Sequence, residues 1–490
     1  MEIQFPTQDQ INEAYQDGEE AVQQLFDTVR IQLVQLGLYV QELRELIQKL
    51  QDQVNKNSRN SKPPSSDGLK KTRTKSLRKS GEHPNGGQLG HPGNTLPQVE
   101  FPDKVEAHKV NICKECQASL DEVEEIGRER RQVFDIPKLH IEVTEHQTLT
   151  KICPQCGTVN HGEFPSEVTQ PTQYGANVKA HAVYLNNYNY IPLDRAARFF
   201  EDVFGHRISE GVILEATDKV AENVKPSNEL IRQKLIDAQT AHFDESGLRV
   251  EKKLQWLHVA STPELTYYEV HPKRGCEAIE CIGIVPQFNG IAVHDHWKPY
   301  FGYTNCDHSL CNAHHLRELT FIEERYEQNW AKDMGNLLRE INEEVKRVRV
   351  TRDHLENEKI RELESRYDKI IEEGKLANPL STENTLPKKR GKQKQSPSRN
   401  LLDRLEDRKI ETLRFMNDFR VPFDNNQGEQ DIRMMKVKQK VSGTFRTMNG
   451  AEQFCKIRSY ISTAWKQGVN ILECLIMALK GAAFMPDSSV

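Results

Sequence analysis

The stretch "AHFDESGLRV", residues 241–250, decides the fold of the centre of the chain, because it opens a run of strand candidates. "KLQWLHVAST" (253–262) and "LTYYEVHP" (265–272) follow it closely, and each has the pattern of a strand. A short helix is expected in "CEAIECIGIV" (276–285), and "NGIAVHDHWKPY" (289–300) supplies a fourth strand. This order predicts a mixed α/β sheet that begins with three antiparallel strands.

Two carboxylates occupy predicted strand ends in this region. Asp244 is expected to end the first strand and Asp295 the fourth. Because neighbouring carboxylates repel each other unless a cation lies between them, the pair suggests a Mg²⁺ site. Glu429, in the first turn of a helix predicted after "DNNQG" (424–428), is the candidate third ligand of a two-metal site for phosphoryl transfer. The alternative is that these are ordinary positions for acids in a chain with 72 of them.

The overall composition sets limits on the kind of protein. A chain of 490 residues is too long for one core and predicts several domains. The net charge of −5 means that a nucleic-acid surface would have to come from local clusters. No run of about eighteen apolar residues is present, so no membrane span is expected. The first thirty residues lack a signal pattern, so we expect a cytoplasmic protein whose ten cysteines are metal ligands or buried thiols.

Residues 1–55 predict a coiled coil that makes a homodimer or a higher oligomer. Val and Ile among the first positions of the heptad, with Leu at three of the four second positions, favour a parallel two-stranded pair. The alternative is an amphipathic helix packed on its own protein. The first positions are Phe26, Leu33, Val40, Ile47 and Val54, and the second positions are Val29, Leu36, Leu43 and Leu50.

Residues 56–100 form a linker that is rich in Pro, Gly, Ser and Asn, so no core is expected there. From Lys56 to Lys79 it carries nine Lys or Arg residues and one acid, Asp67. It is either a solvated linker or a flexible arm that lies along the phosphate backbone of DNA. The candidate DNA contacts are Lys70, Lys71, Arg73, Lys75, Arg78 and Lys79.

Residues 101–165 contain two Cys-x-x-Cys motifs. Cys113 and Cys116 form the first, and Cys153 and Cys156 form the second. Four thiolates at such spacing suit one structural, tetrahedral Zn²⁺. The stretch between the motifs, "RQVFDIPKLHIEVTEHQTLT", is expected to form paired strands that bring them together. A thioredoxin-type redox pair is the rival, but it needs a βαβ context that the sequence does not offer.

Helices are expected in most of the remaining chain. In residues 166–238, a helix, a turn at Gly205 and a second helix capped by Ser209 suggest a helix-turn-helix, although helical hairpins are common in proteins that do not bind DNA.

A Cys-x-x-His element at Cys311 and His314 could pack in the core or, with Cys306, hold a second zinc. The further divisions are a core from 239 to 315, a helical insertion from 316 to 420, the last core helix within 421–450, and C-terminal helices in 451–490.

Several motifs, taken in order, resemble the insertion sequence 66 family of transposases. With the paired Cys motifs, they are "SKPPSSD", "HFDES", "HDHWKPY", "CNAHHLREL", "DNNQGEQDIRMMKVKQKVSGTFRT" and "RSYISTAWKQG". The resemblance extends from the predicted coiled coil to the C-terminal helices. It implies a DDE recombinase with a ribonuclease-H-like α/β core inside a multidomain α+β protein, in which Asp244, Asp295 and Glu429 hold Mg²⁺ or Mn²⁺.

The resemblance also implies an activity and partners. The enzyme would cut double-stranded DNA at the ends of a mobile element and join the freed 3′-hydroxyl to target DNA. The sequence leaves open whether accessory proteins of the same element are further partners. Two alternatives stay open, a nuclease or resolvase on the same core and a non-catalytic, zinc-containing DNA-binding dimer. The basic residues behind the third carboxylate are expected to face DNA; they are Arg433, Lys436, Lys438, Lys440 and Arg446.

Overall fold

The computed structural model describes residues 5–55, 96–380 and 395–487. These residues belong to two compact units. One unit comprises Met1–Lys75, Tyr174–Ala196 and Ser209–Val490, and it holds the large sheet; the other comprises Ser76–Gln173 and Ala197–Ile208. Within the described ranges, no helix combines the length and apolar character needed to cross a membrane.

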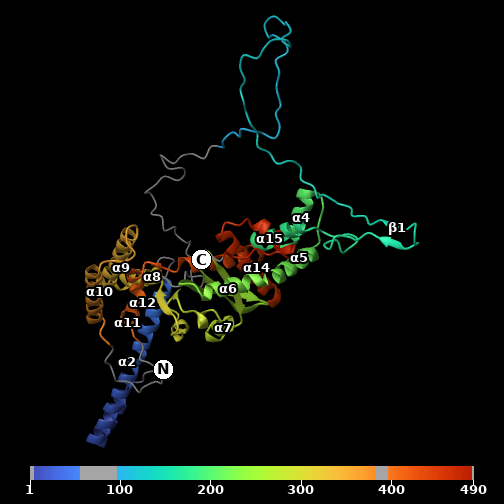
Figure 1. The fold of residues 1–490 in the computed structure, drawn as a ribbon. Helices are drawn as coiled ribbons and strands as arrows, with labels where there is room; N and C mark the ends of the chain where they lie inside the picture. The colour runs from blue at the N-terminus through green and yellow to red at the C-terminus, as the bar shows by residue number, and fades with distance from the viewer. Residues whose placement is uncertain (1–4, 56–95, 381–394, 488–490) are drawn as a thin grey trace. The chain divides into compact units, whose positions relative to one another are not determined.

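A five-stranded mixed sheet lies at the centre of the first unit (Figure 1), in the order β5-β4-β3-β6-β7. β3 (Thr240–Val250), β4 (Lys253–Ser261) and β5 (Thr266–His271) are antiparallel neighbours. β6 (Ile291–His294) pairs in parallel with β3, and β7 (Asp307–Leu310) pairs in parallel with β6. The mixed sheet with three antiparallel strands is therefore as the sequence predicts.

The prediction that Asp244 ends a strand is wrong, because Asp244 lies in the middle of β3. The strand continues to Val250, since Leu248 and Val250 are both buried on one face and extend the alternating pattern. Glu251 and Lys252 then form a two-residue hairpin with φ values of 51° and 65°. Positive φ at both central residues gives a turn whose twist matches the paired strands.

Helices cover both faces of the sheet. On one face, α6 (Lys225–Ile236) and α7 (Cys276–Ile282) contribute to a core that includes Phe243 of β3. On the other face, α13 (Asn426–Ser442) and α14 (Met448–Lys466) pack on a core that includes Leu248. Because side chains alternate along β3, Asp244 lies on the face covered by α13, and Glu245 lies on the opposite face.

A second helical core lies beside α14. It joins α3 (Ala176–Val183), α5 (Glu210–Asn223) and α15 (Ile471–Leu479) to the last turns of α14. A π-helical turn, η1 (Tyr184–Tyr188), follows α3. Ser209 caps α5 by accepting a hydrogen bond from the Val212 N–H, as its sequence predicts. α4 (Leu193–Phe204) and a positive φ of 68° at Gly205 precede this cap.

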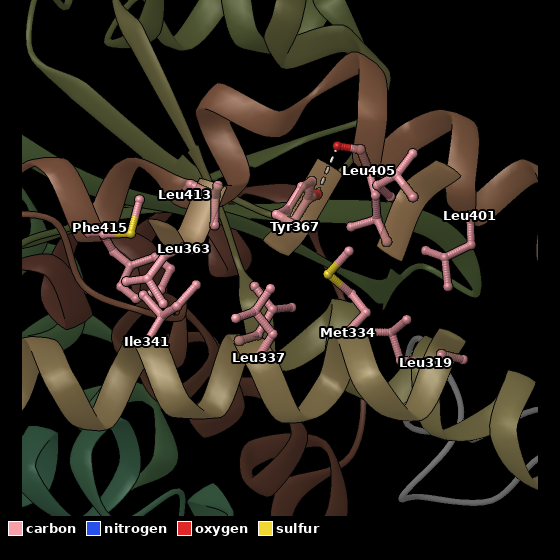
Figure 2. Packing of buried hydrophobic residues seen from close by; sticks show 14 of the residues in the cluster. Leu319, Met334, Leu337, Ile341, Leu363, Tyr367, Leu401, Leu405, Leu413 and Phe415 are labelled. Atoms are coloured by element: carbon pink, nitrogen blue, oxygen red, sulfur yellow. Dashed lines mark hydrogen bonds between the residues drawn. The ribbon is translucent and has the colours of Figure 1, made fainter. Parts of the chain in front are cut away.

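Between β7 and α13, the described residues up to 380 and from 395 onward form five helices of the helical insertion, which has its own core. They are α8 (Asn312–Tyr326), α9 (Asn329–Val348), α10 (Asn357–Ala377), α11 (Pro397–Asp407) and α12 (Lys409–Asn417). Figure 2 shows Met334 and Leu337 pointing into this core, on the side opposite Leu363. The hydroxyl of the buried Tyr367 donates to the Leu405 carbonyl at 2.8 Å, so this polar group is satisfied inside the core.

The N-terminal helices carry the predicted heptad. α1 (Gln8–Asp17) is followed by α2 (Glu19–Asn55), in which most heptad residues face solvent; Phe26 is 71% and Ile47 is 53% exposed, whereas Val29 and Leu36 are half-buried. The end of α2 contacts α8, where the Tyr326 hydroxyl donates to Asp52 Oδ2 at 2.9 Å. The heptad face is therefore open to a partner, and the coiled coil stays a prediction.

The second unit holds the two cysteine motifs. A two-stranded antiparallel ribbon, β1 (Thr150–Ile152) with β2 (Val159–His161), surrounds the second motif. The paired strands predicted between the motifs are wrong, because residues 131–149 contain no assigned strand. Apolar side chains there, such as Val133 and Val143, are exposed rather than packed on a partner strand.

A glycine before β6 allows the parallel pair to form. A Cβ on Gly290 would lie 2.4 Å from the Ala238 carbonyl oxygen and 2.6 Å from that of Gln239. The same backbone approach lets the Ile291 N–H donate to the Gln239 carbonyl at 2.8 Å. The position therefore requires a residue without a side chain, whereas a Cβ on Gly302 would meet nothing within 4 Å.

We predict that Gly290→Ala lowers the free energy of unfolding by about 1–3 kcal/mol, because two backbone oxygens must move apart. Denaturant unfolding of the full chain measures this change. Gly302→Ala is the matched control and should leave stability nearly unchanged. Equal stability of the two variants would contradict the close approach of β3 and β6.

Candidate active site

Asp244 is a partly buried acid that faces α13 from the middle of β3. Its Oδ1 accepts a hydrogen bond from the Glu245 N–H at 2.8 Å. Burial raises the pKa of this carboxyl well above its usual value, and the negative charges of Glu245, Asp295 and Glu429 raise it further. The structure thus brings Asp295 and Glu429 close enough to Asp244 for their charges to raise its pKa.

Strand register accounts for the position of Asp295. His242 of β3 is paired with Val293 of β6 in the parallel ladder, and each acid stands two residues beyond this pair. Residues two apart on a strand point to the same face, so Asp244 and Asp295 emerge side by side. Asp295 directly follows β6, and its Oδ1 accepts the Trp297 N–H at 2.9 Å.

Glu429 reaches the same region from the first turn of α13. Its Oε1 lies 3.5 Å from Arg317 Nη2 and 3.6 Å from His314 Nδ1, both on α8. These separations are ion-pair distances, but this buried oxygen accepts no hydrogen bond from the residues that the structure describes. Arg317 offers a counter-charge, and the oxygen keeps its capacity to bind a further group.

Asn425 fixes the start of α13 against β3, and sequence reasoning missed this role. The residue is 1% exposed, and its side chain does not cap the helix. Instead its Nδ2 donates to the Phe243 carbonyl at 2.9 Å, and its Oδ1 accepts from His242 Nδ1 at 2.8 Å. Its N–H donates to Cys311 Sγ at 3.2 Å. One side chain therefore sets the distance between the helix that carries Glu429 and the strand that carries Asp244.

Glu245 is a second buried acid that sequence reasoning missed. It lies opposite Asp244 and accepts hydrogen bonds from Arg274 Nη2 at 2.6 Å and from the Tyr300 hydroxyl at 2.9 Å. Burial, followed by the charge of Asp295, raises the pKa of Glu245 to about 7. The sequence offered one signal for Glu245. It directly follows Asp244 in a predicted strand, and adjacent strand residues face opposite sides of the sheet.

The basic residues behind Glu429 differ in exposure. Arg433, Lys436, Lys440 and Arg446 are exposed, as DNA contacts require. Lys438 is not available for DNA, and its prediction is wrong. Its Nζ donates to the Gly443 carbonyl at 3.1 Å and lies 3.7 Å from the centre of the Phe445 ring, and burial lowers its pKa to about 8. The predicted contacts Lys70, Lys71, Arg73, Lys75, Arg78 and Lys79 lie outside the described residues.

The candidate recognition helix has an unfavourable charge. One side of α5 is packed in the second helical core. Its exposed side carries Glu210, Glu215, Asp218 and Glu222, with Lys219 as the exposed base among them. A face with this charge would be repelled by DNA phosphates, so the charge of α5 disfavours the helix-turn-helix interpretation.

The carboxylate set fits a divalent metal. Three acids in one partly buried region repel each other, and a cation bound by oxygen ligands would relieve this repulsion. The raised pKa of Asp244 and the open acceptor capacity of Glu429 Oε1 suit such a cation, whereas the ligand atoms of the three acids, all among the described residues, do not all lie within 4.8 Å of one another. Asp244, Asp295 and Glu429 are therefore the residues that could hold Mg²⁺ or Mn²⁺.

Each cysteine motif forms a knuckle by itself. The Gln117 N–H donates to the Cys113 carbonyl at 3.1 Å, and the Gly157 N–H donates to the Cys153 carbonyl at 2.9 Å. Backbone N–H groups of Cys116 and Glu115 lower the pKa of Cys113. Such turns present thiolates for zinc, although among the described residues the four sulfurs do not form one cluster.

The second zinc set considered from sequence is not assembled. Cys306 is buried with the core under α7, where its Sγ lies 3.8 Å from the Tyr303 carbonyl oxygen. Cys311 and His314 instead gather with Glu429, and their ligand atoms all lie within 4.8 Å of one another.

Known protein families account for most of the chain. The model of the transposase IS66 family matches residues 171–453, which is more than half of the sequence. The chain belongs to the IS66 family of transposases. The zinc-finger binding domain of transposase IS66 matches residues 111–157 and supports structural zinc in this transposase. A family of unknown function matches residues 4–97, and no curated protein matches.

We predict that Asp244→Asn stabilises the metal-free transposase at neutral pH, by on the order of 1 kcal/mol or more. A carboxyl whose pKa is raised in the folded state adds stability below its unfolded pKa and loses that contribution as pH rises through its folded pKa. The stability gained by Asp244→Asn should therefore vanish in acid. Thermal melting across pH measures it.

Mg²⁺ gives the second half of this test. It should stabilise the wild type at neutral pH, by about 2.7 kcal/mol at a hundredfold excess over Kd, and leave Asp244→Asn nearly unchanged. Asp202→Asn, which removes an exposed acid of α4, is the control and should respond as the wild type does. A Mg²⁺ response that survives in Asp244→Asn would mean that the metal binds elsewhere.

Proposed function

We propose that this family member is a DDE transposase that cuts DNA at the ends of an insertion sequence and joins the 3′-hydroxyl to target DNA. The observation that carries the proposal is the environment of Asp244, where burial and then the charges of neighbouring acids, Asp295 and Glu429 among them, raise the pKa of the carboxyl. Two-metal sites for phosphoryl transfer need this kind of carboxylate set.

The sheet supports a ribonuclease-H-like core for this chemistry. Its central strand β3 carries the first acid, and the parallel neighbour β6 is followed by the second. The third acid arrives on α13, after a helical insertion that leaves and re-enters the core between β7 and α13. The insertion also supplies Arg317 to the same carboxylate region.

Each part of the site has a proposed task. Mg²⁺ bound there would polarise the scissile phosphate and lower the pKa of attacking water. Asp244, Asp295 and Glu429 hold the metal, and Asn425 keeps the third of these acids in place. The exposed cations of α13 and of the loop that follows it hold the phosphate backbone, which positions DNA without reading its sequence. These cations are Arg433, Lys436, Lys440 and Arg446.

Zinc has a structural task in the proposal. Cys113, Cys116, Cys153 and Cys156 would bind one Zn²⁺ and so join two knuckles that are separated by a long irregular segment. A region with so many exposed apolar side chains has little core of its own, so zinc binding would supply much of its folding free energy.

Two other functions are distinguished by experiment. A nuclease or resolvase on the same core would hydrolyse DNA without joining it to a target. A non-catalytic DNA-binding dimer would bind DNA without metal-dependent cleavage, but selection for binding alone gives no reason to keep three mutually repelling acids.

We predict that Glu429→Gln lowers the rate of strand cleavage in Mg²⁺ by more than about a hundredfold, because several kcal/mol of metal-based stabilisation are lost. DNA binding should be unchanged, since Lys and Arg provide it. Cleavage and gel-shift assays on element-end DNA measure both properties. The matched control is Glu277→Gln, an exposed acid in the first turn of α7. Wild-type cleavage by Glu429→Gln would show that the third carboxylate is misassigned.

We propose that the exposed heptad face of α2 pairs two chains, since transposition requires two DNA ends to meet. We predict that Leu36→Asp with Leu43→Asp gives a monomer, because a buried Leu is worth about 2–5 kcal/mol and the new charges would also be buried. Light scattering measures the mass. Gln35→Asp with Glu42→Asp is the control off the heptad face, and it should leave the dimer intact. A dimeric mass for the Leu variant would place the interface elsewhere.

A further inference from the structure

Cys311, His314 and Glu429 form a cluster of metal-ligating side chains beside the proposed Mg²⁺ set. Their ligand atoms all lie within 4.8 Å of one another. Cys311 is the N-cap residue of α8, without a side-chain capping hydrogen bond, and His314 stands in the first turn, so the spacing of three residues places both on one side of the helix. Glu429 faces them from α13. Oxygen-ligated Mg²⁺ chemistry has no use for a thiol or an imidazole, so this cluster needs its own account.

The separation between His314 and Glu429 is that of two ligands of one ion. His314 Nδ1 and Glu429 Oε1 lie 3.6 Å apart, which is beyond a hydrogen bond. Ligand bonds of about 2.0–2.1 Å at a tetrahedral zinc place nitrogen and oxygen roughly 3.3 Å apart. The pair therefore needs a shift of a few tenths of an ångström to hold a metal.

Cys311 is placed as a thiolate ligand would be. Its Sγ accepts the Asn425 N–H at 3.2 Å, and a backbone N–H directed at sulfur is a common outer contact of a metal thiolate. Burial raises the pKa of the free thiol to about 12, so without metal it stays protonated and unreactive. A bound metal would deprotonate it, because ligating thiols lose their proton on coordination.

We propose that Cys311, His314 and Glu429 bind one Zn²⁺, with water as the fourth ligand. Thiolate and imidazole select zinc over the oxygen-seeking Mg²⁺. Three protein ligands leave one open position, which distinguishes this site from the closed four-thiolate site. Because Glu429 is also assigned to the Mg²⁺ set, zinc bound here would withdraw it from Asp244 and Asp295. This inhibitory consequence, unlike the zinc site itself, rests on the proposed function.

Arg317 sets the strength of the site. Its Nη2 lies 3.5 Å from Glu429 Oε1, so a positive charge stands beside the cation that would bind there. The repulsion between the two should make this zinc weaker than one held by four thiolates. We therefore expect two classes of bound zinc, of which the weaker belongs to Cys311, His314 and Glu429.

Metal titration of the full chain tests the proposal. Metal-depleted protein is titrated with Co²⁺ in excess Mg²⁺, and the sulfur-to-cobalt absorption band and the bound metal are measured without DNA. The wild type should bind a tight and a weaker equivalent, both with sulfur ligation. Cys311→Ser and Glu429→Gln should each abolish the weaker one. Cys306→Ser is the matched control, because it changes a buried cysteine outside the cluster, and it should keep both.

Several outcomes would overturn the proposal. Retention of the weaker equivalent by both Cys311→Ser and Glu429→Gln would do so, and so would a wild type whose sulfur band is lost entirely in Cys153→Ser. If thermal melting shows that Cys311→Ser does not fold, Glu429→Gln decides the test, because Gln is isosteric with Glu and position 429 is partly exposed. Because no DNA is present, a negative result leaves the cleavage tests of the proposed function standing, and failed cleavage leaves this titration valid.

Discussion

The burial of Asp244 among other acids is the constraint on which the account of this transposase depends. A carboxylate in the middle of β3, under α13, is costly to keep charged, and Asp295 and Glu429 increase that cost. A protein gains no stability from such an arrangement in the absence of a cation. We therefore interpret the sheet, with its parallel strand β6 beside β3, and the placement of α13 after the helical insertion as an arrangement that holds repelling carboxylates for a metal.

Asn425 and the helical insertion make this arrangement of carboxylates rigid. Asn425 links β3, α13 and the N-terminus of α8 through hydrogen bonds that are all buried. α8 in turn is packed into the separate core of the insertion and directs Arg317, His314 and Cys311 toward Glu429. The insertion is thus more than a spacer, because the charge and the metal preference around the third carboxylate come from its first helix.

The sequence predicted what local patterns control and missed what depends on three-dimensional neighbours. Alternation predicted the strands, and the first candidate, residues 241–250, already continued past Asp244, although Asp244 was expected to end it. Apolar spacing between the knuckles suggested strands, yet strands also need a partner to pair with. The buried state of Lys438 and the three-way role of Asn425 could not be predicted, because both depend on residues far away in the chain. Family motifs named the carboxylates without saying what holds them.

Diffraction from crystals soaked in Mn²⁺, collected where manganese scatters anomalously, tests the central claim most directly. The account predicts an anomalous peak bounded by the carboxyl oxygens of Asp244, Asp295 and Glu429, and its loss in crystals of Asp244→Asn. Manganese bound elsewhere, or no peak between these acids at saturating Mn²⁺, would contradict it.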